Sequence, residues 1–201
     1  GLEVWIDSAA LEADLIVPIN RVKLHTDFVG DIQSGLCKML TIGLGNHVGC
    51  SALHEASFEG FAETLIEAAR IVMARAPVGF GVAILENAYD ETAMIEAVPA
   101  EDIVEREKEL LQTAKELMPT LMISDIDVLV VEEIGKDISG AGFDPNVLGR
   151  SSLLKKFVLP VPQIKRMVLL DVTVPSHGNA IGVGLFDVIT RRVLDKLDLP
   201  S

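Results

Sequence analysis

The feature that most limits the fold of this chain is a pattern that occurs three times. A hydrophobic run is followed each time by a polar, glycine-containing loop that carries a histidine or a lysine. The runs cover residues 13–20, 127–133 and 166–174, and their loops carry His25, Lys136 and His177. Short continuous apolar runs of this kind are typical of buried strands. Because ligands of open α/β sheets bind beyond the carboxyl ends of the strands, we expect one sheet whose loops converge on a single site.

The residues available for a core are aliphatic. Hydrophobic residues make up 49% of the 201 positions and aromatic residues only 4%, which suits α/β layers. We therefore predict an α/β fold with a mainly parallel sheet, helices on both faces and glycine-rich loops at the C-terminal ends of the strands. Expected helices cover residues 36–42, 58–76, 99–118 and 184–197, and residues 79–98 read as a strand with a hairpin partner. We expect two domains, residues 1–76 and 77–201.

The charge of the chain limits its partners. A formal net charge of -13 opposes binding to nucleic acid or to an anionic membrane, so a small-molecule ligand is expected. Two cysteines do not form a disulfide framework, and no run is long and apolar enough to span a bilayer, so we expect a cytoplasmic protein. The sequence starts GLEVWIDSAA, without Met, and is expected to be a piece of a longer protein.

Reactive side chains concentrate in residues 19–56, which hold three of the four histidines and both cysteines. Ser34 is expected to cap a helix through residues 36–42, which places Lys38 in its second turn. An isolated lysine on a helix is usually a surface residue. The neighbours of Lys38 are apolar, however, and Gly35 allows close approach, so its amine could also be activated by desolvation for covalent chemistry.

The histidines of this stretch have different candidate roles. Asp27 could orient the imidazole of His25 and set its tautomer, as a general base requires, although a loop histidine bonded to backbone explains the pattern equally well. His54 precedes a predicted helix, where the neutral ring that a metal ligand needs is favoured, or where it simply packs. His47, in GNHVG, is interpreted as part of a turn.

Three further motifs are weak. The glycines at 43, 45 and 49 miss the dinucleotide spacing and follow a helix, so we discard a Rossmann fingerprint. Gly140-Ala141-Gly142 follows a strand but lacks the third glycine of a phosphate loop. Cys37, Cys50 and His54 form an admissible zinc ligand set without a CxxC pair.

Three segments carry a resemblance that spacing alone does not show: VPINRVKLHTDFVGDIQSGLCKMLTIGLG, EEIGKDISGAGFDPNVLGR and VTVPSHGNAIGVGLFDVITRR. They resemble the corresponding stretches of the lactate-racemase-like family, which includes the nickel-pincer-dependent lactate racemase. The resemblance implies that Lys38, in SGLCK, carries a covalently bound nickel pincer nucleotide beside Ser34 and Gly35. It also implies that His54 ligates the nickel and that His25, with Asp27, is catalytic.

The function that this resemblance implies is that of an isomerase, a racemase or epimerase of a 2-hydroxy acid that works by hydride transfer. The family's other catalytic histidine and its substrate-carboxylate arginine belong to an N-terminal domain that is missing here, so the fragment is expected to be inactive alone. Pincer biosynthesis proteins are implied as partners. The Tyr-Gln-x-x-Lys-type substrate segment of the lactate enzymes is absent, so the substrate is expected to differ from lactate. The residues that could contact it instead are Lys136, Arg150, His177 and Asn179.

Other readings of the same residues remain open. A homologue without the cofactor could bind a small anionic or phosphorylated ligand through the glycine loops at 135–149 and 178–184. A structural or regulatory domain would bind neither nickel nor anion. A zinc hydrolase would use His25, Asp27 and His54.

Overall fold

The chain divides into two compact units, Gly1–Pro119 and Thr120–Ser201. The computed structural model describes residues 2–55 and 60–198, without the side chains of His54 and Glu55. The boundary lies later than the expected one after residue 76, because strand β1 (Ile19–Arg21) pairs in parallel with strand β2 (Phe80–Glu86). A division at residue 76 would split this sheet, so the sequence-based boundary was wrong.

The first unit is built on a three-stranded sheet in the order β1-β2-β3. β2 and β3 (Thr92–Pro99) form the predicted antiparallel hairpin. The predicted strand at residues 13–20 is shorter than expected: only its end belongs to β1, and half of its residues are exposed. Helices α1 (Ser8–Leu11) and α3 (Asn46–Glu55), helix α4 (Phe61–Arg75), and helix α5 (Ile103–Leu117) with the short 3-10 turn before it (Ala100–Asp102) complete this unit. Ser57, the expected cap of the long helix, lies outside the described residues.

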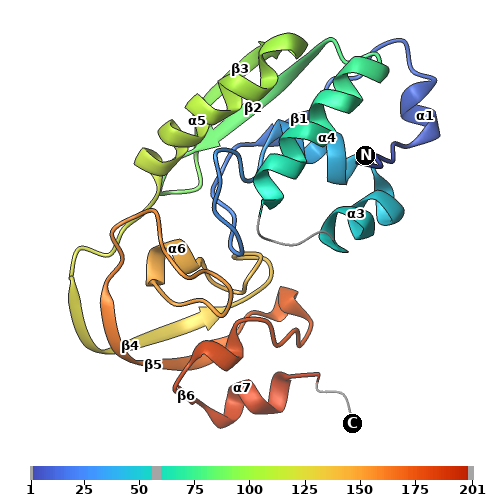
Figure 1. Cartoon of the computed structure of the whole chain (residues 1–201). Helices are drawn as coiled ribbons and strands as arrows, with labels where there is room; N and C mark the ends of the chain where they lie inside the picture. Colours follow the sequence, from blue (N-terminus) through green and yellow to red (C-terminus); the bar gives the residue numbers. More distant parts are fainter. Residues whose placement is uncertain (1, 56–59, 199–201) are drawn as a thin grey trace. The chain divides into compact units, whose positions relative to one another are not determined.

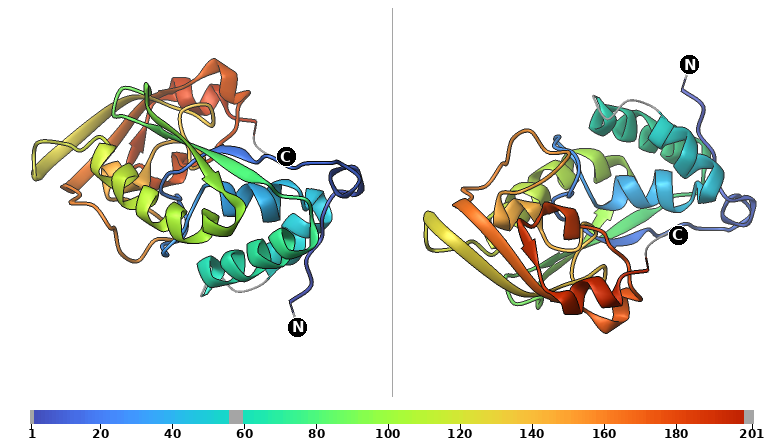
Figure 2. Two further views of the ribbon diagram at one scale, coloured as in Figure 1. Left: turned by 90° about the horizontal axis from the view of Figure 1, so that it is seen from above. Right: turned by 90° about the horizontal axis from the view of Figure 1, so that it is seen from below.

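One face of this sheet is covered and the other is open. A Cβ on Gly81 would lie 2.6 Å from Leu36 and 3.4 Å from Ile103, so helices α2 (Leu36–Lys38) and α5 both pack over β2 at this notch. Figures 1 and 2 show α5 lying along the β2–β3 hairpin. The opposite face carries Ile19 and Ile95, which are 57% and 66% exposed. Among the described residues, helices therefore cover one face of this sheet and not both.

The second unit has its own parallel sheet, in the order β4-β5-β6. Its strands are β4 (Asp125–Ile134), β5 (Gln163–Val172) and β6 (Val188–Ile189), with helix α6 (Pro145–Leu148) between β4 and β5 and helix α7 (Arg191–Lys196) after β6. The predicted helix at 184–197 is thus a 3-10 turn (Val183–Leu185), a short strand and a shorter helix. Its core is formed by Ile134, Phe143, Leu169, Val172, Val183 and Val193.

Two sequence-based expectations about these strands need correction. β4 was expected to be buried, but Val128 and Val130 on its outer face are 56% and 55% exposed. The three strand-and-loop repeats were expected in one sheet, yet β1 belongs to the first unit and β4 and β5 to the second. The α/β class is confirmed, with two mostly parallel sheets in place of one.

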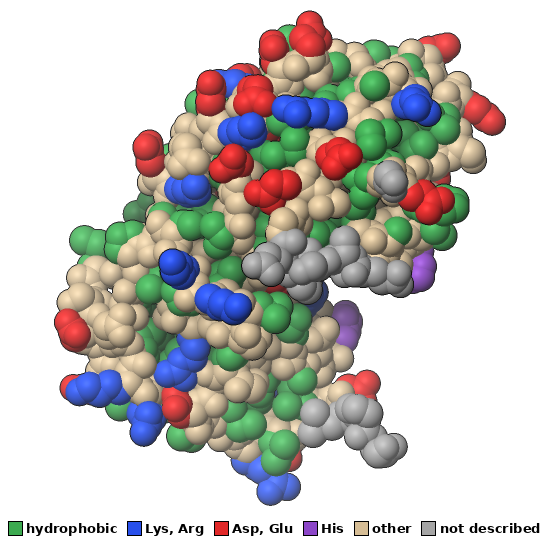
Figure 3. Space-filling view, in the orientation of Figure 1, with side chains coloured by type: hydrophobic (Ala, Val, Ile, Leu, Met, Phe, Trp, Pro, Cys, Tyr) green, Lys and Arg blue, Asp and Glu red, His purple; other side chains and the backbone are tan. Residues whose placement is uncertain are grey.

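None of the described helices combines the length and hydrophobicity that crossing a bilayer requires. Acidic and basic side chains of the first unit are interspersed on the face shown in Figure 3, with hydrophobic side chains visible between them.

Candidate functional site

The Lys38 helix has an unusual backbone. A single α-helical turn, α2, continues into a π-helix at Met39–Gly43, where the Leu44 N–H donates to the Met39 carbonyl at 2.9 Å. π-Helical turns are rare and occur often at functional sites. The expected Ser34 cap is wrong, because the residue at the N-cap is Gly35, which has no side chain, and Ser34 instead pairs with Lys23 in an antiparallel bridge.

The Lys38 amine lies in surroundings that favour its uncharged form. The side chain is half-buried, and burial is the first cause that lowers the pKa of Lys38, with repulsion from Lys23 as the second. Asp27 and Cys50 act in the opposite direction, which places both within electrostatic reach of the amine. Asp27 lies in the loop that carries His25, and a site shared by Lys38 and His25 stays a prediction.

The His25 imidazole is held in a defined tautomer. Its Nδ1 accepts a hydrogen bond from the backbone N–H of Asp27 at 3.1 Å, so the proton of the neutral ring lies on Nε2. The Gln33 side-chain oxygen accepts from the His25 N–H at 2.7 Å, and Phe28 lies against the ring at 4.4 Å between centroids. This bond comes from the Asp27 backbone, so it is the kind of contact that the loop-histidine alternative predicted.

The other candidate ligands of this unit are less informative. His54 belongs to α3, but its side chain lies outside the described residues, so its nickel-binding role stays a prediction. His47 is exposed at the start of α3. Cys37 is fully buried, and burial followed by Glu107 raises the pKa of its thiol, which disfavours the thiolate that zinc needs. Within the described part of the chain, no three His, Cys, Asp or Glu side chains are placed to hold a metal ion.

The sequence-based analysis missed two residues of this site, Glu107 and Thr41. The sequence predicted a helix over residues 99–118 without a role for Glu107, but this residue is 1% exposed and its carboxyl accepts the Cys37 N–H. A signal for it was present, because Glu107 falls in the apolar stripe of α5. That stripe consists of Ile103, Val104, Glu107, Leu110, Leu111 and Ala114.

The candidate substrate residues of the second unit lie in the loops after β4 and β5. The Lys136 N–H donates to Ser176 at 2.9 Å, and its ammonium donates to the Gly140 carbonyl at 2.7 Å, which leaves two N–H donors on an exposed side chain. His177 is exposed, in a left-handed conformation. Asn179 is exposed and its side-chain oxygen accepts from Ile181.

Arg150 is the candidate whose contacts argue against substrate binding. Its guanidinium donates to the carbonyls of Leu185 and Ile164 at 2.9 and 3.2 Å and to the Asp187 carboxylate at 2.6 Å. These bonds tie the loop after α6 to β5 and to the segment before β6. With these three acceptors the Arg150 guanidinium has a structural role, so its predicted contact with a substrate carboxylate is not supported.

Replacing Arg150 with Ala is expected to lower the melting temperature of the second unit by about 5 °C. Arg150 is the first cause that lowers the pKa of Asp187, so the stability it adds is present above the unfolded pKa and is lost as pH falls through the folded one. The gap between variant and wild type should therefore narrow in acid, as calorimetry at several pH values can show. Arg166→Ala is the control, because its contact with Asp187 is longer, at 3.7 Å. Equal melting temperatures for the two variants would contradict the structural role of Arg150 and make it a candidate for substrate binding again.

The glycine loops of the second unit use their backbone donors internally. The N–H of Gly135 donates to Gly142, that of Ser139 donates to Gly135, and that of Gly142 donates to Ser139. In the 178–184 loop the N–H groups of Asn179 and Val183 are bonded in the same way. An anion cradle needs such groups to point outward, so these contacts do not favour the phosphate-binding alternative.

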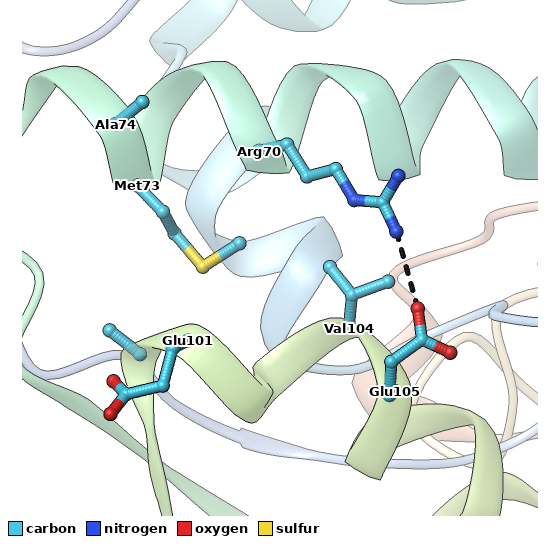
Figure 4. A pocket seen from close by; sticks show the side chains of 7 residues that line it. Arg70, Met73, Ala74, Glu101, Val104 and Glu105 are labelled. Atoms are coloured by element: carbon cyan, nitrogen blue, oxygen red, sulfur yellow. Dashed lines mark hydrogen bonds and ion pairs between the residues drawn. The ribbon is translucent and has the colours of Figure 1, made fainter.

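A pocket of about 410 Å³ lies between α4 and the start of α5. Figure 4 shows Met73 and Val104 in it and the Arg70–Glu105 ion pair, 3.2 Å long, at one side. Its charged groups are paired or exposed, so it presents no reactive side chain.

The comparisons with known proteins give no family. No family model matches the chain, and no similar protein was found among curated proteins or solved structures.

Proposed function

We propose that the chain is part of a cytoplasmic racemase or epimerase of a 2-hydroxy acid, with Lys38 as the covalent anchor of a nickel pincer nucleotide. The observation that carries this proposal is the half-buried Lys38, whose pKa is lowered by burial and which directly precedes the π-helix. The resemblance of the sequence to the lactate-racemase-like family supplies the cofactor.

The surroundings of Lys38 support this proposal. Covalent attachment needs an unprotonated amine, and the surroundings of Lys38 favour it. Among the described residues, no carboxylate forms an ion pair with Lys38 that would hold it protonated. When bound, the cofactor supplies a hydride acceptor. His54 is proposed as the nickel ligand, since an imidazole suits Ni(II).

The chain's own residues then divide the remaining work. His25 is proposed as the general base that takes the hydroxyl proton. In the described tautomer neither ring nitrogen can accept this proton, because Nδ1 accepts the Asp27 N–H and Nε2 carries the ring proton. To act as a base, His25 would have to release the Asp27 N–H from Nδ1, or move its proton from Nε2 to Nδ1. Lys136, whose ammonium has two further N–H donors, stays a candidate for the substrate carboxylate, and His177 and Asn179 stay candidate substrate contacts. The N-terminal domain and the pincer biosynthesis proteins remain proposed partners.

The decisive experiment is mass spectrometry of the full-length protein expressed with nickel and pincer biosynthesis proteins. We expect a mass adduct on the Lys38 peptide that disappears in Lys38→Arg and persists in Lys115→Arg, a substitution on α5. An unmodified Lys38 under conditions that load a lactate racemase would overturn the proposal.

A further inference from the structure

The carboxyl of Glu107 contacts the backbone next to Lys38. Glu107 comes from α5, is 1% exposed, and its Oε2 accepts the Cys37 N–H at 2.8 Å. Neither α2 nor the π-helix has a side-chain cap from its own flanking residues. The buried carboxyl therefore takes over at this helix start the part that an N-cap side chain normally plays.

Gly35 is what lets the carboxyl approach. A Cβ on Gly35 would lie 2.5 Å from Glu107 Oε1 and 2.6 Å from its Cδ, closer than real Cβ contacts. The sequence suggested that a backbone or a ligand could approach Gly35, whereas the group next to Gly35 in the described structure is the Glu107 side chain. Substituting Gly35 would push the carboxyl away from the helix start without changing Glu107 itself.

Thr41 holds the other side of the same residue. Its buried hydroxyl donates to the Cys37 carbonyl at 2.8 Å, and that carbonyl belongs to the peptide bond that leads into Lys38. Cys37 is therefore fixed at its N–H by Glu107 and at its carbonyl by Thr41. Both bonds lie in the interior, where losing one partner leaves a buried polar group unsatisfied.

Burial is also the first cause that raises the pKa of Glu107, against the lowering effect of the N–H groups of Cys37 and Leu36. In the described structure its Oε1 has no hydrogen-bond partner. Both observations fit a neutral carboxyl group better than a buried charge.

We propose that Glu107 is a positioning residue for Lys38: its carboxyl caps the helix start and, with Thr41, holds the lysine in its half-buried place. The inference rests on the proposed function for its purpose, because a fixed, uncharged amine is what attachment of a cofactor requires. It predicts that the protonation of the Lys38 amine depends on the Glu107 carboxyl, although no described hydrogen bond joins the two groups.

The test measures the reactivity of Lys38 in the chain without cofactor. Trace acetylation over a range of pH, read by mass spectrometry, gives the pH midpoint of the Lys38 amine, with Lys115 as the reference for reagent strength. In Glu107→Ala the midpoint should rise by about one pH unit, so that acetylation at neutral pH falls about tenfold. Glu107→Gln keeps a neutral carbonyl for the Cys37 N–H and should stay within about twofold of wild type.

Gly35→Ala should raise the midpoint as Glu107→Ala does, and it decides the matter if Glu107→Ala fails to fold. Glu116→Ala, an exposed change on the same helix, is the control and should have no effect. A folded Glu107→Ala or Gly35→Ala with the wild-type midpoint, or a Glu107→Gln that behaves like Glu107→Ala, would overturn the inference. If the pH midpoint of Lys38 shifts in these variants but no pincer adduct forms, only the proposed function is wrong. If the adduct forms but the midpoint does not shift, only the positioning role of Glu107 is wrong.

Discussion

Replacing His25 with Asn is expected to lower the turnover of a 2-hydroxy acid by about 10²- to 10⁴-fold, the range for loss of a general base. The Asn side-chain oxygen can replace Nδ1 as the acceptor for the Asp27 N–H, so the loop conformation should survive. What disappears is the titrating imidazole. The adduct on Lys38 should therefore form as in the wild type while conversion fails.

The measurement is chiral chromatography of a panel of small 2-hydroxy acids, using the full-length protein loaded with cofactor. Substrates with deuterium at C2 add a second readout, because hydride transfer keeps the label in the product whereas proton abstraction loses it to water. His47→Asn, on the exposed start of α3, is the matched control. Unchanged turnover in His25→Asn, or loss of the adduct together with turnover, would contradict the assignment of His25 as the base.

Replacing Gly182 with Ala is expected to destabilise the second unit by about 3–5 kcal/mol. Gly182 has a φ of 83°, and a Cβ there would lie 2.3 Å from the Ala141 carbonyl oxygen. Gly142 faces the Ile181 carbonyl from the opposite loop in the same way, at 2.5 Å. The two loops thus approach each other backbone to backbone, and neither contact can be relieved by moving a flexible side chain. A loss of this size is a large part of the stability of an ordinary domain.

Hydrogen exchange read by mass spectrometry can follow the two units separately. Peptides of the second unit should exchange faster in Gly182→Ala, whereas the fluorescence of Trp5, the single tryptophan, should report an unchanged first unit. Gly184→Ala is the control in the same loop, because nothing lies within 4 Å of its Cβ position. Equal exchange in the two variants would show that the loops can separate without cost.

The sequence predicted the local elements better than their assembly. The β2–β3 hairpin and the amphipathic α5 follow from periodicity, and the α/β class follows from strands alternating with helices. The division into two sheets could not be predicted, because strand pairing depends on contacts distant in sequence, such as that between Ile19 and Val82.

The candidate site shows the same limit. The pattern of small and apolar residues around Lys38 indicated a shielded amine, and the lowered pKa of Lys38 agrees with this. The cap of its helix could not be found in the flanking sequence, since Glu107 lies far along the chain and only tertiary packing brings it to Cys37. The contacts of Arg150 could not be predicted for a related reason: its partners at Leu185 and Asp187 become neighbours only in the fold.

The distance in sequence between Lys38 and Glu107 also sets an order of events during synthesis. Chains emerge from the ribosome N-terminus first, so Lys38 is exposed to solvent well before α5 has been made. Its helix gains the buried carboxyl only when residue 107 is available and α5 has packed over β2. Any enzyme or cofactor that requires the finished surroundings of Lys38 must therefore act after residue 107 has left the ribosome and the first unit has folded.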